Sequence, residues 1–73
     1  MPVDWATLKA AEAARRKAAD PEARAVLNAL INKILNPYSP SGDVVVVRAR
    51  LRGRRLTVVA VVKGRRKTYT FVV

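Results

Sequence analysis

Five arginines close together in the second half of the chain are the residues best suited to chemistry. Arg48, Arg50 and Arg52 occupy alternate positions, and Arg54 and Arg55 follow after Gly53. Side chains two apart on a β-strand lie on the same face, so these guanidinium groups would share one surface. Guanidinium groups bind phosphate and carboxylate oxygens in pairs. The pattern therefore predicts a surface for nucleic acid or another polyanion, or for an acidic protein. The alternative is a solvated strand without a partner.

No set of residues predicts catalysis. Histidine and cysteine are absent, which removes the commonest general base, the commonest metal ligand and any thiolate. The five acidic residues fall at expected helix starts, within a helix or at a loop end, and no pair has the spacing of a general acid and base. They are Asp4, Glu12, Asp20, Glu22 and Asp43. We expect no enzyme activity, no cofactor and no metal.

Lys67 is a lesser candidate, because the expected strand pattern directs it to the core face at the rim of the sheet. A partly buried lysine can be reactive. A lysine at a sheet rim more often protects an open edge, with its ammonium group in water. We favour the second role.

The charge of the chain is uneven along its length. Residues 37–73 carry nine basic side chains and one acidic, whereas residues 1–36 carry six and four. This balance favours an anionic partner over a neutral one. No apolar run approaches the ~20 residues of a membrane span, and the first residues lack the pattern of a signal peptide. We expect one domain over residues 1–73, soluble, made in the cytoplasm and without a membrane partner.

Two helices are expected before the sheet, over about residues 4–19 and 21–35. Asp4 is a suitable cap for an alanine-rich first helix. Asp20 and Pro21 form a strong signal for the start of the second, with Asp as the cap and Pro at the first helical position. Apolar residues of the second helix recur three and four apart and predict one buried face: Ala23, Val26, Leu27, Leu30, Ile31 and Ile34.

Three strands are expected over about residues 44–52, 55–63 and 66–73. Two Gly-Arg pairs, at Gly53 and Gly64, predict two-residue type II′ turns, because glycine readily adopts positive φ at the first turn position. The first turn pairs residues whose numbers sum to 107, and the second pairs residues that sum to 129. The pairs expected on the inner face of the first hairpin are Leu51 with Leu56, Ala49 with Val58, Val47 with Ala60 and Val45 with Val62.

These elements predict a two-layer α+β fold, in which an N-terminal helical hairpin packs on one face of a three-stranded antiparallel meander. The expected core joins the second helix to the inner sheet residues Val45, Val47, Leu51, Leu56, Val58, Val62, Tyr69 and Phe71, with Trp5 and Leu8 covering one end. The outer face would then carry the arginines.

An apolar cluster is also expected on that outer face. Val46, Val59 and Val61 would lie together there and could form an interface. We expect a monomer, with a weak homodimer through these valines or through an open strand edge as the alternative.

The regularity of the chain resembles that of de novo designed mini-proteins. Every glycine and proline lies at an expected boundary, and no element interior is interrupted. Agreement of capping, patterning and turn chemistry is what designers aim for. This resemblance implies a scaffold without native enzymatic or ligand-binding activity, which is the function we expect first. A small basic binding module that uses the arginine face is the alternative.

The order of two helices before a meander also resembles that of RelE/ParE-type toxins, small basic proteins of which some cleave messenger RNA on the ribosome. The stretch Ile34-Leu35-Asn36-Pro37 before the sheet is similar to theirs. The chain has no histidine and no basic-aromatic cluster at its C-terminal end. No residue role is therefore carried over from that family.

Overall fold

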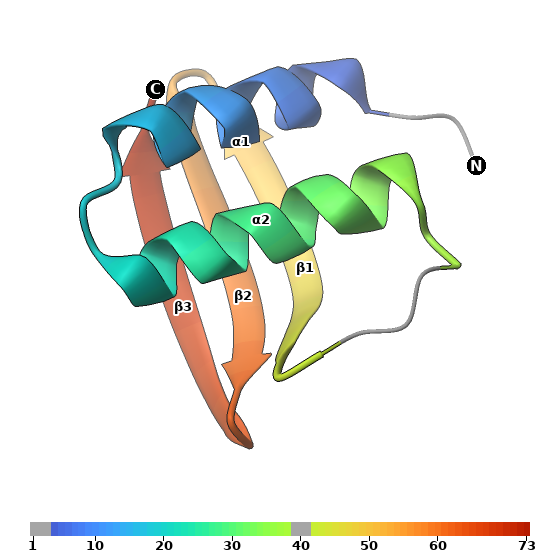
Figure 1. Ribbon diagram of the computed structural model, residues 1–73. Helices are drawn as coiled ribbons and strands as arrows, with labels where there is room; N and C mark the ends of the chain where they lie inside the picture. The colour runs from blue at the N-terminus through green and yellow to red at the C-terminus, as the bar shows by residue number, and fades with distance from the viewer. Residues whose placement is uncertain (1–3, 39–41) are drawn as a thin grey trace.

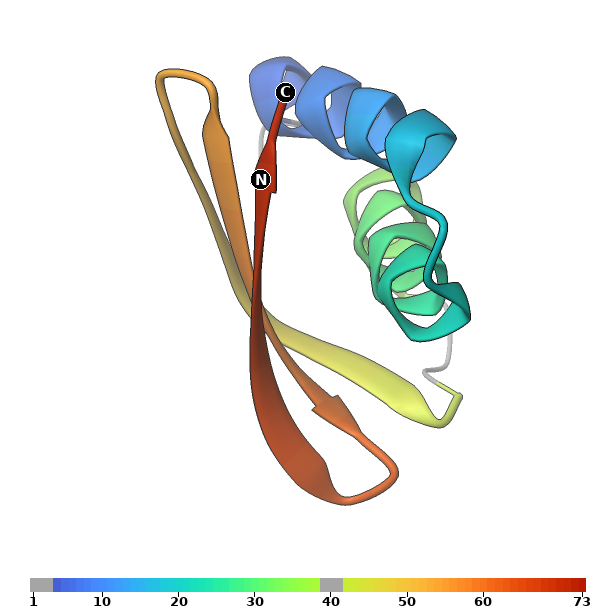
Figure 2. The same cartoon turned by 90° about the vertical axis from the view of Figure 1, so that its left-hand side faces the viewer.

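Two helices precede three strands in the computed structural model, which describes residues 4–38 and 42–73. The elements are α1 (Trp5–Lys17), α2 (Pro21–Leu35), β1 (Val44–Arg52), β2 (Arg55–Val62) and β3 (Arg65–Val72). The strands form one antiparallel sheet in the order β1-β2-β3. Both helices lie on the same face of it (Figure 1), and Figure 2 shows the two layers from the side. The predicted α+β fold is confirmed. Neither α1 nor α2 is long and apolar enough to cross a membrane.

The two helices begin where the capping residues predict. Asp4 accepts a hydrogen bond from the backbone N–H of Thr7 at 3.2 Å, and Asp20 accepts one from Ala23 at 3.0 Å. The first helix ends at Lys17, two residues earlier than predicted. Ala18 has extended backbone there, because the short link before the Asp20 cap must leave the helix to reverse the chain direction.

The core lies between α2 and the inner face of β1 and β2. Val26 and Leu27 from α2 and Leu56 and Val58 from β2 are fully buried. Burial of these apolar side chains is the main favourable contribution to the free energy of folding for a chain of this size. The small side chains of α1 let that helix approach closely, and three of them are buried: Ala10, Ala11 and Ala14.

One end of the predicted core is different. Leu8 is buried as expected, but Trp5 is 62% exposed and does not cover the sheet. Trp5 is the first residue of α1, and the exposed Ala6 follows it, so the buried face of α1 begins only at Thr7.

The first hairpin turn forms as predicted. Gly53 has a φ of +58° and Arg52 lies opposite Arg55, so the turn residues are Gly53 and Arg54. A positive φ at the first turn position alone is the mark of a type II′ turn. This turn fixes Leu51 opposite Leu56, also as predicted.

The second turn differs from the prediction by one residue. Lys63 and Gly64 have φ values of +51° and +79°, which makes the turn type I′, and Val62 lies opposite Arg65. The predicted Gly64-Arg65 turn is therefore wrong. Each β2 residue faces a β3 partner two positions earlier than expected, so Tyr69 lies opposite Val58. A shift of two leaves every side chain on its predicted face.

A β-bulge in β1 overturns part of the predicted core. Val46 lies opposite Ala60 and Arg48 opposite Val59, so Val47 is the extra residue. Before the bulge the faces are exchanged: Val46 is buried, whereas Val45 and Val47 are exposed. The prediction placed Val45 and Val47 in the core and Val46 outside. Four consecutive valines have no alternation from which a register could be read.

A contrast between two neighbouring valines tests the bulge. Val46 is 5% exposed and Val47 is 46% exposed. We expect Val46→Ala to lower the free energy of unfolding by about 2 kcal/mol, through lost burial and a residual cavity. Val47→Ala should change it by less than about 0.5 kcal/mol. Urea unfolding followed by circular dichroism measures both. Equal losses, or a larger loss for Val47→Ala, would restore the unbulged register.

Candidate anion-binding surface

The five arginines predicted to bind anions lie around the β1–β2 turn. All are exposed. The register places Arg52 opposite Arg55, Arg50 opposite Thr57 and Arg48 opposite Val59, while Arg54 occupies the turn. We call Arg48, Arg50, Arg52, Arg54 and Arg55 the arginine surface.

The bulge separates this surface from the apolar part of β1. Residues 48–52 keep the predicted alternation, so Arg48, Arg50 and Arg52 share the sheet face opposite the helices. Ala49 and Leu51, between them, pack toward the core. The arginines are thus held by a strand anchored on its other face.

The arginine surface has no acidic neighbour along the strands. All five acidic residues precede β1 in the sequence. Within residues 4–38 and 42–73, the one ion pair joins Lys67 of β3 to Glu22 of α2. Across the sheet, Arg52 faces Arg55, and like charges in directly opposed positions repel. No acidic side chain among the described residues therefore neutralises this positive charge.

Three of the arginines line a hollow that sequence reasoning missed. Arg52, Arg54, Arg55 and Val72 line an open hollow of about 410 Å³. Val72 lies opposite Arg55, so Arg52, Arg55 and Val72 form one row across the three strands. The predicted register of the second turn gave Arg55 no partner on the third strand. The signal for this contact was the Lys63-Gly64 pair, which suits a type I′ turn.

Arg54 is held in place by Val73, the residue that follows β3. Its Nε donates a hydrogen bond to the Val73 oxygen at 3.1 Å, and the Val73 N–H donates to the Arg54 carbonyl at 2.7 Å. These two bonds tie the turn to the strand end beside Val72, so the Arg54 guanidinium is oriented before any ligand arrives.

Lys67 was predicted to be either a reactive lysine or an edge-protecting one, and in the structure it forms an ion pair with α2. Its ammonium group lies 2.6 Å from Glu22 Oε1, and the Tyr69 hydroxyl donates to the same oxygen. The Lys67 ammonium, followed by the Tyr69 hydroxyl, lowers the pKa of the Glu22 carboxyl. The bond to Glu22, followed by burial, raises the pKa of Tyr69 to about 12. At neutral pH the Tyr69 phenol stays protonated and is not an available base. The contact of Glu22 with Lys67 and Tyr69 joins α2 to β3.

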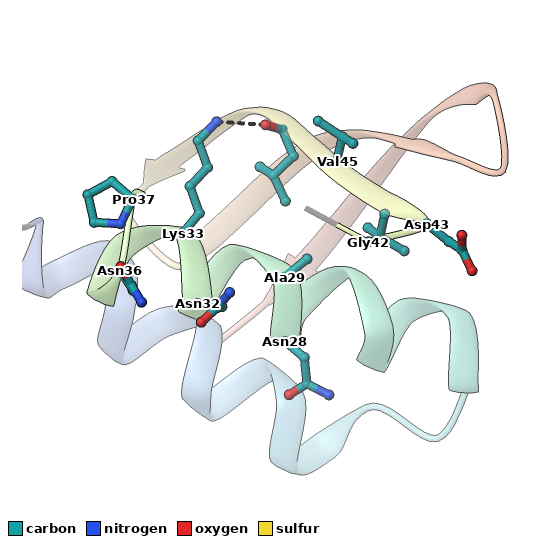
Figure 3. Close-up of a pocket in the computed structure, with 11 residues that line it drawn as sticks. Asn28, Ala29, Asn32, Lys33, Asn36, Pro37, Gly42, Asp43 and Val45 are labelled. Carbon is teal, nitrogen blue, oxygen red and sulfur yellow. Dashed lines mark hydrogen bonds between the residues drawn. The ribbon is translucent and has the colours of Figure 1, made fainter. Parts of the chain in front are cut away.

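A second hollow, also missed, lies between α2 and the start of β1. It is a half-open hollow of about 370 Å³, and three asparagines at four-residue spacing line it, two on α2 and the third at its C-cap (Figure 3): Asn28, Asn32 and Asn36. Asparagine is a poor helix former, so its recurrence was the available signal. Lys33 lies there too, but its ammonium donates to the Val46 carbonyl at 2.7 Å. The carboxylate of Asp43 makes this hollow less suited to anions.

The predicted valine interface is only partly present on the outer face. Val46 is buried under α2 and is wrong as an interface residue. Val59 and Val61 lie on the outer face and are half-buried, with Val45 opposite Val61. An outer valine patch of Val45, Val47, Val59 and Val61 therefore continues from the arginine surface along the same face.

No protein-family model, curated protein or solved structure matches this chain with statistical significance. The resemblances to designed mini-proteins and to RelE/ParE-type toxins stay predictions. A function for the chain must therefore be argued from its own geometry.

The Glu22 contact predicts a pH dependence of stability. The folded pKa of Glu22 is lowered, so its contribution is present above the unfolded pKa and is lost as the pH falls through the folded pKa. We expect Glu22→Gln to lower the melting temperature at pH 7, and the difference from wild type to shrink as the pH is lowered to about 2.

Glu12→Gln is the matched control, since Glu12 makes no side-chain hydrogen bond within residues 4–38 and 42–73. It should change the melting temperature little at either pH. A Glu22→Gln difference that is constant with pH would show that the charge of Glu22 is irrelevant.

Proposed function

We propose that this chain binds nucleic acid through the arginine surface, mainly by contacts to phosphates. The observation that carries the proposal is the gathering of five exposed guanidinium groups around one turn, on strands that contain no acidic residue. A positive surface of this kind attracts a polyanion by releasing its condensed counterions.

The spacing of the strand residues suits a duplex backbone. Alternate residues on a strand are about 6.8 Å apart, so Arg48 to Arg52 extends over about 13 Å. Duplex DNA carries one negative charge per about 1.7 Å of axis, which gives about eight charges over that length. Each guanidinium group can therefore meet a phosphate, and its planar fork can contact two oxygens.

The aromatic residues argue against recognition of single strands by base stacking. Tyr69 and Phe71 lie on the inner side of β3 and stack on each other, with ring centroids 6.3 Å apart. The outer face carries arginine, valine and threonine among the described residues. Sheet surfaces that bind single strands present aromatic rings to the bases. Phosphate contacts alone position a protein without specifying sequence, so we expect little sequence preference.

A scaffold without binding activity is the second candidate function. It is favoured by side-chain caps on both helices, proline at the first position of α2 and two-residue turns between all strands. The third candidate is a binder of an acidic protein, which the arginine surface and the adjoining outer valine patch would both contact.

A salt titration tests the leading proposal. Neutralisation of four to five phosphates gives a slope of log affinity against log salt of about −4 on duplex DNA. We expect the double change Arg48→Ser and Arg50→Ser to reduce the slope to about −2, because two phosphate contacts are lost. The melting temperature should stay nearly unchanged, since both side chains are exposed. Fluorescence anisotropy with a labelled duplex measures the affinity.

Arg16→Ser with Arg24→Ser is the matched control, because both arginines are exposed on the helical layer. This pair should leave the slope near its wild-type value. Equal losses from the two pairs would mean diffuse charge attraction and would contradict a binding surface. Absence of binding at low salt would favour the scaffold, and a salt-insensitive complex with one acidic protein would favour the third candidate.

A further inference from the structure

The hollow at the β1–β2 turn differs chemically from the rest of the arginine surface. We propose that Arg52, Arg54 and Arg55 form a discrete site for a terminal phosphate of a nucleic-acid strand, with Arg48 and Arg50 contacting the phosphates that follow. This inference rests on the proposed function and adds which chemical group the protein prefers.

Two of the three arginines are brought together by the turn itself. Arg52 and Arg55 flank the two-residue turn and are direct partners in the ladder. Directly opposed Cα atoms in such a pair are about 5.5 Å apart. Within residues 4–38 and 42–73, neither side chain makes a hydrogen bond or an ion pair. Arg50 faces Thr57 instead, so no second cation lies directly across from it. An anion is the partner that would relieve the repulsion between Arg52 and Arg55.

Arg54 adds a third guanidinium group that is already oriented. Its Nε is used by the Val73 oxygen, which leaves the two terminal nitrogen atoms for a ligand. The backbone bond from Val73 to Arg54 holds the same turn against the end of β3. Ordering of long side chains is a main cost of binding. A tethered Arg54 reduces that cost for this site, and within the described residues the other arginines of the surface have no such tether.

The charge of the hollow fits a phosphomonoester better than a phosphodiester. Three arginine residues line it. A backbone phosphodiester offers one negative charge, whereas a terminal phosphate carries nearly two at neutral pH and exposes three oxygens. Charge-assisted hydrogen bonds to guanidinium groups are also stronger than neutral ones. A terminal phosphate can therefore pair with more of the arginines in the hollow than a phosphodiester can.

The fourth wall of the hollow is apolar. Val72 is 68% exposed and lies opposite Arg55. An apolar wall suits the C–H surface of a sugar attached to the phosphate. Arg48 and Arg50 continue the positive row along β1, away from the hollow. A nucleic-acid strand that begins in the hollow would place its next phosphates over them, whereas a phosphorylated peptide would leave them without a partner.

The test compares two forms of one duplex, with a 5′-phosphate or a 5′-hydroxyl on one strand, by anisotropy at fixed ionic strength. We expect the phosphorylated form to bind about three- to tenfold more tightly at pH 7.5. The advantage should shrink at pH 5, because the second ionisation of a phosphomonoester lies near pH 6 and the group then keeps only one of its two charges. The chain has no histidine, and the hollow is lined by Arg52, Arg54, Arg55 and Val72.

Variants locate the preference within the surface. Arg52→Ser with Arg55→Ser should abolish the advantage of the phosphorylated duplex while leaving salt-dependent binding. Arg48→Ser with Arg50→Ser should weaken both duplexes by the same factor and preserve the advantage.

The two proposals fail in different ways. Equal wild-type affinity for the two duplexes would overturn the terminal-phosphate site and leave the proposed function standing. Absence of binding to either duplex at low salt would overturn the proposed function itself. Tighter binding of a phosphoserine peptide than of the phosphorylated duplex would overturn the inference and assign the hollow to a phosphoprotein.

Discussion

Burial of one face of a three-stranded sheet beneath two helices is the constraint on which the rest of the structure depends. Val26 and Leu27 of α2 and Leu56 and Val58 of β2 have no exposed surface, so the inner face cannot be exchanged with the outer one. The outer face is consequently left to water along the whole length of β1 and β2. The side chains of that face are free to serve a function, because the core does not need them.

The bulge at Val47 divides the outer face into two chemical halves. Before it, the face carries Val45 and Val47, and after it the face carries Arg48 and the other arginines. The Val46 carbonyl beside the bulge accepts a hydrogen bond from the ammonium of Lys33, so α2 stabilises the irregular strand from the edge (Figure 3). A regular β1 would have buried Val47 and exposed Val46, and the outer valine patch would have consisted of different residues.

Local signals in the sequence were sufficient for the helices, the first turn and the arginine surface. Asp4, Asp20 and Gly53 act on residues within three positions of themselves, which is why they could be interpreted without a structure. The second turn was misplaced because glycine can occupy either the first or the second position of a two-residue turn. The structure uses Gly64 at the second position, and a positive φ at the first position is rare for a residue such as Lys63. The Glu22 contact with Lys67 joins residues 45 apart, and no local pattern indicates it. The hollow beside Val72 depends on the pairing of β2 with β3. That pairing was predicted two residues out of register, so the hollow was missed.

The most direct test of the account is the location of DNA on the protein, mapped by amide chemical shifts of the ¹⁵N-labelled chain during titration with a short duplex. If DNA binds to the arginine surface, we expect the largest shifts in residues 48–55 and at Val72, with small shifts in α1 and α2. These shifts should saturate as DNA is added, and more DNA should be needed for saturation at higher salt. Shifts concentrated on Arg16, Lys17 and Arg24 of the helical layer, or spread evenly over both layers, would contradict the account.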